Sequence, residues 1–515
     1  MKHILFIILA LTFISYIFAE QPIKELSLQD AITLALEKNL DLQIEKYNPE
    51  VSDAQIAYQK GIFYPTFSST IQSESSTRPA NSDLQGATQI SENIFNYNFA
   101  ISYLSTYGTN ASLTFQNSRN DTNSIFVTLN PTYYSSLNFN LTQPLLRNFG
   151  KDNVQYLYIQ AKNNKLISNE NYRQKIIDII LATQQAYWDT VYAYENYEVK
   201  KYSLELAKKL LKDTETQVEV GSLAPIEVLT AKADVATREE QLIAAENLIL
   251  KAENVLKSLI DDNEDPQLLL YRIKPTTQPD HENPTFNYEE LVETALKNRP
   301  EISITEVNIK VRQEDEKYYK NKLLPDLNLK FSLGLNGVGG ERILYSGDFF
   351  NRQIIGKVPG GYSDTLEQLF GADYRNWALG FEFVYPIFGK QEKANYLKVQ
   401  LEKDKAILQK KRIKQQIIIE LENALLEIEY SFKRIEAAKV ATELQYEKLK
   451  AEEKKLEVGL STNFYVLKYQ EDLSIAKSNE LAAIIAYKKA IAQLEHAISS
   501  PLPQSKLKWE IKTTE

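Results

Sequence analysis

Hydrophobic and polar residues alternate with two different periods along this chain. Segments 151–220 and 390–458 contain neither Gly nor Pro, so each predicts one uninterrupted helix of roughly 100 Å, at about 1.5 Å per residue. In the second segment, apolar or small residues recur seven positions apart in two registers: Ile417, Ala424, Ser431 and Ala438, and Leu421, Ile428, Ile435 and Thr442. Such a seam predicts left-handed coiled-coil packing, which a soluble coiled-coil rod would also show.

Each predicted long helix ends at a Val-Gly pair and is followed by a second helical segment. We expect the returning helices at 226–261 and 464–499, which makes two helical hairpins with arms of unequal length. Shorter helices are expected at 27–60 and 287–322, and each of these begins with a capping-box pattern. The short helices could complete the return path of the hairpins.

Strands are expected between these helices. Four segments alternate apolar and polar residues with a period of two: 67–71, 137–141, 327–335 and 377–383. This alternation, with its aromatic residues, is typical of outer-membrane β-barrel strands with a lipid face and a wet lumen. A half-buried strand of a soluble protein looks the same. Four prolines, Pro65, Pro144, Pro325 and Pro386, mark the expected helix–strand junctions, where a missing N–H costs least.

Four strands cannot close a barrel, and open sheet edges are not tolerated in lipid. Several chains must therefore share one barrel: three would give 12 strands and two would give eight, whose interior would be filled by side chains. If the protein is a conduit, three chains are favoured, because a 12-stranded barrel leaves more room inside than an eight-stranded one. The first half also alternates at 97–103 and 113–115, around Gly108, which we interpret as an additional hairpin at the extracellular end. Segment 337–375 would be the corresponding outer loop.

The chain carries an internal repeat. Residues 26–44 align with residues 286–304 at an offset of 260, and the same offset places Pro65 on Pro325. The two Val-Gly turns form a second matched pair. We therefore predict two structural repeats, 20–262 and 286–500. They are separated by an irregular, proline-containing linker at 263–285 and followed by a C-terminal tail, 501–515.

The N-terminus has the pattern of a secretory signal peptide. Lys2 and His3 precede an apolar run from 4 to 18, and Ala19 supplies a small residue at the exit. We place the signal peptide at 1–19. A transmembrane anchor is the alternative, but the run is shorter than the ~20 residues that a spanning helix needs. The protein is therefore expected to be exported, and any membrane insertion would use strands.

Composition excludes several classes of function. The chain has no Cys and only three His, His3, His281 and His496, which lie far apart in the sequence, so we expect no metal site and no cofactor. The net charge of −9 gives no basic footprint for nucleic acid. The sequence does not favour an exported enzyme, because the chain has no Gly-rich phosphate loop, no Cys and few His residues.

Taken together, these motifs resemble the TolC-type outer-membrane efflux family. The resemblance rests on the duplicated SLQDAI-like helix start, the FYP and LLP strand starts, the TQPLL strand end and the VG-x6-VL turns, and it covers nearly all of the mature chain. It implies an α+β membrane protein, in which a long coiled-coil helical tunnel continues into a trimeric 12-stranded outer-membrane β-barrel. An equatorial belt would come from the linker and the tail.

The resemblance also implies a function. Family members act as ducts that cross the periplasm and the outer membrane, dock a periplasmic adaptor (membrane fusion) protein and work with an inner-membrane transporter that supplies the energy. No reaction is catalysed, and the cargo could be a drug, a metal ion or a polypeptide. The alternatives are a passive outer-membrane porin and a structural envelope coiled-coil protein. A porin reading leaves the two long helices unexplained.

The resemblance assigns roles to the turns and to the residues just after them. The turns that would face the adaptor are Val220-Gly221-Ser222 and Val458-Gly459-Leu460, although each glycine could simply serve a helix C-cap. In TolC, acidic residues just past the turns line the periplasmic gate. The matching positions here are Glu227, Thr230, Tyr465 and Lys468, so the acidic ring is missing. Lys468 and Glu227 could form ion pairs that hold the opening shut, or Lys468 could point into water.

Overall fold

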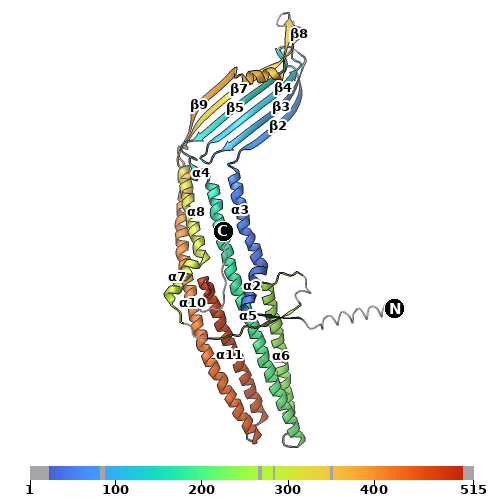
Figure 1. The fold of residues 1–515 in the computed structure, drawn as a ribbon, viewed down its shortest axis with the longest axis vertical. Coiled ribbons are helices and arrows are strands. Elements are labelled where there is room, and N and C mark those ends of the chain that lie inside the picture. Colours follow the sequence, from blue (N-terminus) through green and yellow to red (C-terminus); the bar gives the residue numbers. More distant parts are fainter. Residues whose placement is uncertain (1–21, 82–86, 265–269, 282–284, 348–351, 503–515) are drawn as a thin grey trace, which may run out of the picture. The chain divides into compact units, whose positions relative to one another are not determined.

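The computed structural model of the protein describes residues 22–81, 87–264, 270–281, 285–347 and 352–502 (Figure 1). The predicted signal peptide and nearly all of the predicted tail lie outside these residues. The chain divides into two compact units, which we call the helical unit (Met1–Glu50, Leu166–Glu306 and Leu408–Glu515) and the sheet unit (Val51–Lys165 and Val307–Ile407). Each predicted repeat contributes residues to both units.

Two helical hairpins form as the sequence predicts. The first comprises α5 (Tyr156–Glu219) and α6 (Pro225–Ile260), and the second comprises α10 (Lys390–Glu457) and α11 (Asn463–Ile498). The first long helix is shorter than expected, because Lys151–Val154 forms a separate turn, α4, before α5 begins. No helix within the described residues is both long and apolar enough to span a bilayer.

The predicted heptad seam on α10 is confirmed as a buried stripe. Leu421 and Ser431 are completely buried, and Ile417, Ala424, Ile428 and Ile435 are nearly so. These side chains pack against apolar residues of α11 and of the short helix α7 (Tyr288–Asn298), among them Leu494 and Ala295. The corresponding core of the first repeat joins α5 and α6 to α2 (Leu28–Lys38).

Each predicted short helix is broken once, at equivalent positions of the two repeats. The helix expected at 27–60 is α2 followed by α3 (Leu40–Gly61), and the helix expected at 287–322 is α7 followed by α8 (Pro300–Lys322). Asn39 and Arg299, which lie 260 residues apart, both adopt an extended conformation at the breaks.

The two breaks have different causes. Arg299 precedes a proline, which disfavours the helical conformation of the residue before it. Asn39 instead caps α3, because its Oδ1 accepts the N–H of Leu42 at 3.1 Å. In both repeats the extended residue still donates its own N–H to a helix carbonyl four residues earlier.

The predicted irregular linker contains a strand. Within 263–285, β6 (Arg272–Pro275) pairs in parallel with β1 (Ile23–Leu26). The Arg272 Nε atom contacts both carboxylate oxygens of the buried Glu253, at 3.0 and 2.9 Å. The description of this segment as wholly irregular was wrong, because its prolines flank the strand or end it and do not interrupt its pairing with the N-terminal segment.

The sheet unit contains seven antiparallel strands in one sheet (Figure 1). They are β2 (Thr66–Pro79), β3 (Gln89–Leu104), β4 (Asn110–Thr122), β5 (Leu129–Pro144), β7 (Asp326–Ser346), β8 (Gln353–Val358) and β9 (Tyr374–Val384). The order is β2-β3-β4-β5-β7, and both β9 and β8 pair with β7. β3 and β4 therefore lie between β2 and β5. The expectation of a hairpin projecting beyond the sheet was wrong, because β3 and β4 pair with the flanking strands within it.

The segment predicted to be an outer loop is largely ordered. β7 continues to Ser346, and β8 and the helix α9 (Tyr362–Phe370) follow it. α9 lies against β7 and β5. A Cβ atom added at Gly337 would lie 2.1 Å from the carbonyl oxygen of Thr365, so glycine is required where the helix meets the sheet. The Gly-rich composition of this segment thus reflects close packing rather than a free loop.

The α10 seam generates a stability prediction. Leu421→Ala removes a side chain that is 0% exposed, and we expect the free energy of unfolding to fall by about 2–5 kcal/mol. Leu444→Ala, on the same helix but 65% exposed in the single chain, is the matched control and should cost well under half as much. Denaturant unfolding followed by circular dichroism measures both variants. Equal losses would show that the seam does not carry the packing of this helix.

Candidate functional site

The turn between α5 and α6 is a Schellman motif. Gly221 has a φ of +78°, which favours glycine. Its N–H donates to the Val218 carbonyl, and the N–H of Ser222 donates to the Gln217 carbonyl at 2.8 Å. These two bonds satisfy carbonyl groups that the end of α5 would otherwise leave unpaired. α6 then begins at Pro225, which suits the first position of a helix.

The turn between α10 and α11 repeats this geometry. Gly459 has a φ of +77°, its N–H donates to the Leu456 carbonyl, and the N–H of Leu460 donates to the Lys455 carbonyl at 2.8 Å. The two matched landmarks in the sequence are therefore the same structural device. This finding accounts for both glycines through their backbone conformation alone.

The side chains beside these glycines are apolar and exposed. Val220, Val458 and Leu460 are 71%, 68% and 79% exposed. A Cβ atom at Gly221 or Gly459 would meet nothing within 4 Å. The chain itself therefore gives no packing reason for apolar residues at the two turns, which leaves a patch of apolar surface beside each of them.

The four residues predicted to form a gate lie in the first turns of α6 and α11. The Thr230 hydroxyl donates to the Ile226 carbonyl within its own helix, and Glu227 lies in the first turn of α6. The ring of Tyr465 contacts those of Phe464 and Tyr469, with centroids 5.6 and 6.4 Å away. Within the described residues, no hydrogen bond or ion pair joins Glu227 or Thr230 to Tyr465 or Lys468.

Lys468 has partners that the sequence analysis did not consider. Its Nζ atom lies 3.2 Å from an oxygen of Asp472 and 3.3 Å from an oxygen of Glu471. Hydrogen bonds to Asp472 and Glu471 raise the pKa of Lys468 above its usual value. Acidic residues are thus present one turn beyond the predicted position, paired with a lysine, and the i, i+3 and i, i+4 spacing could have identified them.

A buried arginine joins the two hairpins near these residues. Arg238 of α6 is 3% exposed, and its guanidinium donates to the carbonyl of Ser203 on α5 at 2.9 Å and to the carbonyl of Leu467 on α11 at 3.1 Å. It also forms an ion pair with Asp234 at 2.8 Å. Burial lowers the pKa of Arg238 and raises that of Asp234, and the attraction between them opposes both shifts. One side chain therefore holds three helices together.

A second polar contact joins the hairpins closer to the turns. The Asn463 amide, at the start of α11, donates to the hydroxyl of Thr214 on α5 at 2.9 Å. Both side chains are buried. Sequence patterns alone could not identify the contacts between the two hairpins, Arg238 with Leu467 and Asn463 with Thr214. The two partners of each contact lie more than 200 residues apart in the sequence.

The junction prolines lie at strand ends, where the structure changes from sheet to helix. Pro65 and Pro325 directly precede β2 and β7. Pro144 is the last residue of β5, and Pro386 follows β9. None of the four interrupts a strand, which agrees with the lack of an N–H group in proline.

The sheet has one apolar and one polar face. Ile101, Leu113 and Leu333 belong to the apolar face and are exposed in the single chain. On the polar face, Lys330 forms an ion pair with Glu382 across β7 and β9 at 2.7 Å, and Asn328 donates to the same carboxylate. Within the described residues, α9 is the helix that packs against the sheet, and it lies mainly against β5 and β7.

Comparison with known proteins identifies the family. A model of the family described as "Outer membrane efflux protein" matches residues 107–261 and 291–500, well over half of the chain. The chain belongs to the outer membrane efflux protein family. This efflux protein therefore lies in the outer membrane and extends into the periplasm, and its family consists of channel proteins rather than enzymes. The comparison with curated protein sequences gave no match.

Solved structures share the fold at low sequence identity. The CmeC outer membrane channel of Campylobacter jejuni superimposes with a TM-score of 0.64 at 17% identity, covering 93% of this chain and 87% of that one. A membrane protein from Pseudomonas aeruginosa gives 0.65 at 17%, covering 93% and 91%. The MtrE outer membrane channel of Neisseria gonorrhoeae gives 0.62 at 17%, covering 93% and 91%. At this identity, the likeness concerns the fold of the efflux protein.

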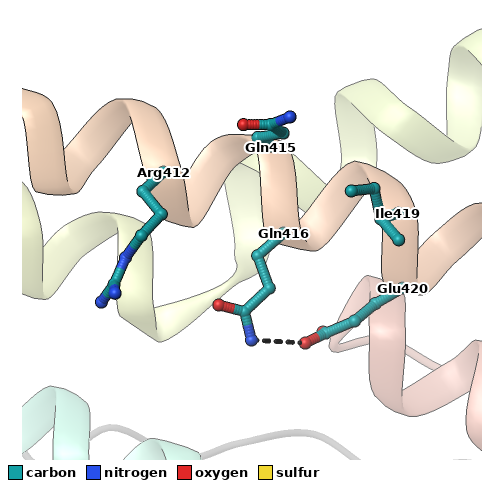
Figure 2. Close-up of a pocket in the computed structure, with 5 residues that line it drawn as sticks. All are labelled: Arg412, Gln415, Gln416, Ile419 and Glu420. Carbon is teal, nitrogen blue, oxygen red and sulfur yellow. Dashed lines mark hydrogen bonds between the residues drawn. The ribbon is translucent and has the colours of Figure 1, made fainter.

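A shallow hollow on α10 offers no site for chemistry. Figure 2 shows its lining, Arg412, Gln415, Gln416, Ile419 and Glu420, which all come from one helix. Gln416 donates to Glu420 at 3.0 Å, and Glu420 also binds the buried Arg299 of the adjacent helix break at 2.9 Å. The hollow is open to solvent, and its polar groups serve the helix packing.

The buried arginine of the efflux protein generates a prediction. Arg238→Met would leave the partly buried Asp234 carboxylate without its cation and remove the contacts that link α6 to α5 and α11, so we expect a loss of about 2–4 kcal/mol in the stability of this region. Arg434→Met, at an exposed position of α10, should change stability by less than about 0.5 kcal/mol. Hydrogen exchange of 231–242 and the thermal midpoint measure the effect. Unchanged exchange in Arg238→Met would show that Arg238 does not hold the hairpins together.

Proposed function

We propose that this protein is the outer-membrane channel of a tripartite efflux or type I secretion system. Three copies would form a duct that carries small molecules or polypeptides across the periplasm and the outer membrane. The observation that carries the proposal is the combination of two hairpins ending in matched, exposed apolar turns with a sheet of one apolar and one polar face. A passive porin would need the sheet but not the hairpins.

The turns at 220–222 and 458–460 are the docking surface for a periplasmic adaptor protein. The glycines at these turns adopt the positive φ that the turn backbone requires. The side chains of Val220, Val458 and Leu460 are exposed to water. Exposed apolar side chains that the chain does not cover are typical of protein–protein contacts. The adaptor would connect the channel to an inner-membrane transporter, which supplies the energy for export. No bound cofactor is needed for this role.

The docking proposal is tested at Leu460. Leu460→Asp places a charge in the apolar surface and should abolish export, because burying an unpaired charge in an interface costs several kcal/mol. Leu460→Met at the same position keeps the surface apolar and is the matched control. The assay is complementation of a strain that lacks the gene, using whichever loss of compound resistance or protein secretion the deletion causes.

Trimer mass by light scattering and the amount of protein in the outer membrane must be unchanged in both variants. Export that survives Leu460→Asp at normal levels would show that this turn does not dock a partner. A folded monomer or dimer in detergent would contradict the trimer itself.

The first turns of α6 and α11, with Glu227, Thr230, Tyr465 and Lys468, form the periplasmic gate in this proposal. Three-fold symmetry would bring three copies of Lys468 and its partners Glu471 and Asp472 to one opening. The lysines neutralise acids that would otherwise repel each other across the opening. Tyr465 would narrow it sterically.

The gate proposal predicts the response to multivalent cations. Lys468→Met removes the cation nearest to Glu471 and Asp472, so hexamminecobalt should block single-channel current at a roughly tenfold lower concentration. Adding Glu471→Gln and Asp472→Asn to the same variant should restore the weak block of the unmodified channel. A block that is unchanged in all three proteins would place the gate elsewhere.

A further inference from the structure

Six strands of the sheet, not four, are long enough to cross a membrane. β2, β3, β4, β5, β7 and β9 contain 14, 16, 13, 16, 21 and 11 residues, and a transmembrane strand needs about 9–11 residues. β8, with 6 residues, is too short. The hairpin formed by β3 and β4 therefore has the dimensions of the membrane wall.

The apolar face runs through this hairpin without a gap. The strand register aligns one residue from each strand in a single row: Phe67, Ile101, Leu113, Phe139, Leu333 and Trp377. All six are large and apolar. A second row adds Phe99 and Phe115 of the hairpin beside Leu137 and Leu335. A hairpin that projected into water beyond the membrane would have no reason to carry apolar residues in register with those of β2 and β5.

The opposite face is polar along the same register and carries no charge at its centre. The row next to the apolar one contains Thr66, Ser102, Ser112, Asn140, Ser332 and Ala378. The following row contains Ser68, Ala100, Thr114, Asn138, Gly334 and Asn376. β3 and β4 thus supply hydroxyl and amide groups of the same kind as their neighbours, which suits the wall of a water-filled lumen.

α9 contacts the hairpin on the same side of the sheet as the apolar rows. The contact lies further along the strands, where polar residues such as Asn117 and Ser135 replace the apolar ones. The Tyr362 hydroxyl donates to the side chain of Asn117 on β4 at 2.9 Å, and the Tyr362 ring contacts that of Tyr97 on β3, with centroids 5.7 Å apart. The hydroxyl of Ser135 on β5 donates to the same Asn117 oxygen. A helix from the second repeat therefore fixes the hairpin in the sheet.

Both edges of the sheet are open. Within the described residues, β2 pairs with β3 alone and β9 pairs with β7 alone. All 14 residues of β2 and ten of the 11 residues of β9 are exposed. The apolar row reaches both edges, with Phe67 at one and Trp377 at the other. Unpaired edges are not tolerated in hydrocarbon, and a second copy of the same sheet offers the matching edge and continues the same row.

We infer that β2 of one copy pairs with β9 of the next, and that three copies close an 18-stranded barrel with a lumen lined mainly by uncharged polar groups. The number of copies, three, rests on the proposed function. The number of strands that each copy contributes, six, rests on the observed sheet. Because barrel diameter grows roughly linearly with strand number, this barrel would be about 1.5 times as wide as one of 12 strands. Barrels of 16–18 strands leave an aqueous channel.

Cysteine labelling tests the inference in the full chain, which contains no Cys of its own. The variants Ile101→Cys and Ser102→Cys probe the two faces of β3, and Leu113→Cys and Ser112→Cys probe those of β4. A charged, water-soluble maleimide is added to outer membranes, and the labelling rate is measured. We expect the apolar-face thiols to react roughly tenfold or more slowly, because the reactive thiolate does not form in hydrocarbon.

Leu333→Cys and Ser332→Cys on β7 are the matched controls, since they lie in the same two rows. If the apolar-face thiol is labelled more slowly than the polar-face thiol on β7, on β3 and on β4, the result supports six wall strands per copy. A contrast on β7 with fast labelling at all four hairpin positions would place the hairpin in water and overturn the inference while leaving the proposed channel intact. Equal labelling on β7 itself would show that the sheet is not a membrane wall, which overturns the proposed function as well.

The mass of the folded assembly in detergent then fixes the number of strands in the barrel. Three copies with six labelled strands each give 18, as inferred. Two copies would give 12 and would overturn both the trimer and the wide barrel. Cross-linking between Cys residues scanned along β2 and β9 should join neighbouring copies, and its absence in every register would contradict the proposed contact between the edges.

Discussion

A backbone N–H or C=O group in hydrocarbon has no water to bind, and the design of the sheet unit follows from this constraint. Its strands are antiparallel throughout, so that each inner strand finds partners on both sides. The prolines at the sheet–helix junctions lack an N–H group and lie at strand ends, as Pro65 and Pro144 do. Within the described residues, β2 and β9 each pair on one side only and form the long edges of the sheet, where another copy can supply a partner.

The helical unit depends on a different interaction, the burial of apolar stripes between long helices. The α10 seam buries Leu421 and its neighbours, and the equivalent core of the first repeat buries Ile180 and Tyr187. Polar groups also enter these interfaces, and several of them are hydrogen-bonded, as Gln184 is to Glu495. Arg238 and Asn463 make contacts that depend on where several helices meet, so they restrict how the hairpins can slide.

Much of this fold could be predicted from the sequence, since it follows from local periods. The two hairpins, the heptad seam on α10 and the strand starts after Pro65 and Pro325 are all set by nearby residues. The break at Arg299 also had a local signal in Pro300. The break at Asn39 did not, because it depends on an amide that both caps α3 and donates to the Leu259 carbonyl.

The misjudged elements depend on distant partners. β6 forms because β1 lies beside it, about 250 residues earlier in the chain. The β3–β4 hairpin has no counterpart in the second repeat, which favours an extension outside the sheet, but its pairing with β2 and β5 places it within the sheet. The acids that pair with Lys468 were visible in the sequence. They lie three and four residues beyond Lys468, outside the positions that match the family's gate.

An inserted hairpin leaves the direction of every other strand unchanged. β2 and β5 are antiparallel whether or not two strands separate them, so a β2–β5 connection could gain or lose the pair without reversing the chain at Pro144. The circumference of such a wall can therefore change in steps of two strands per copy, while the helices that enter and leave it keep their number. Pore width and tunnel architecture can then evolve as separate traits in this family.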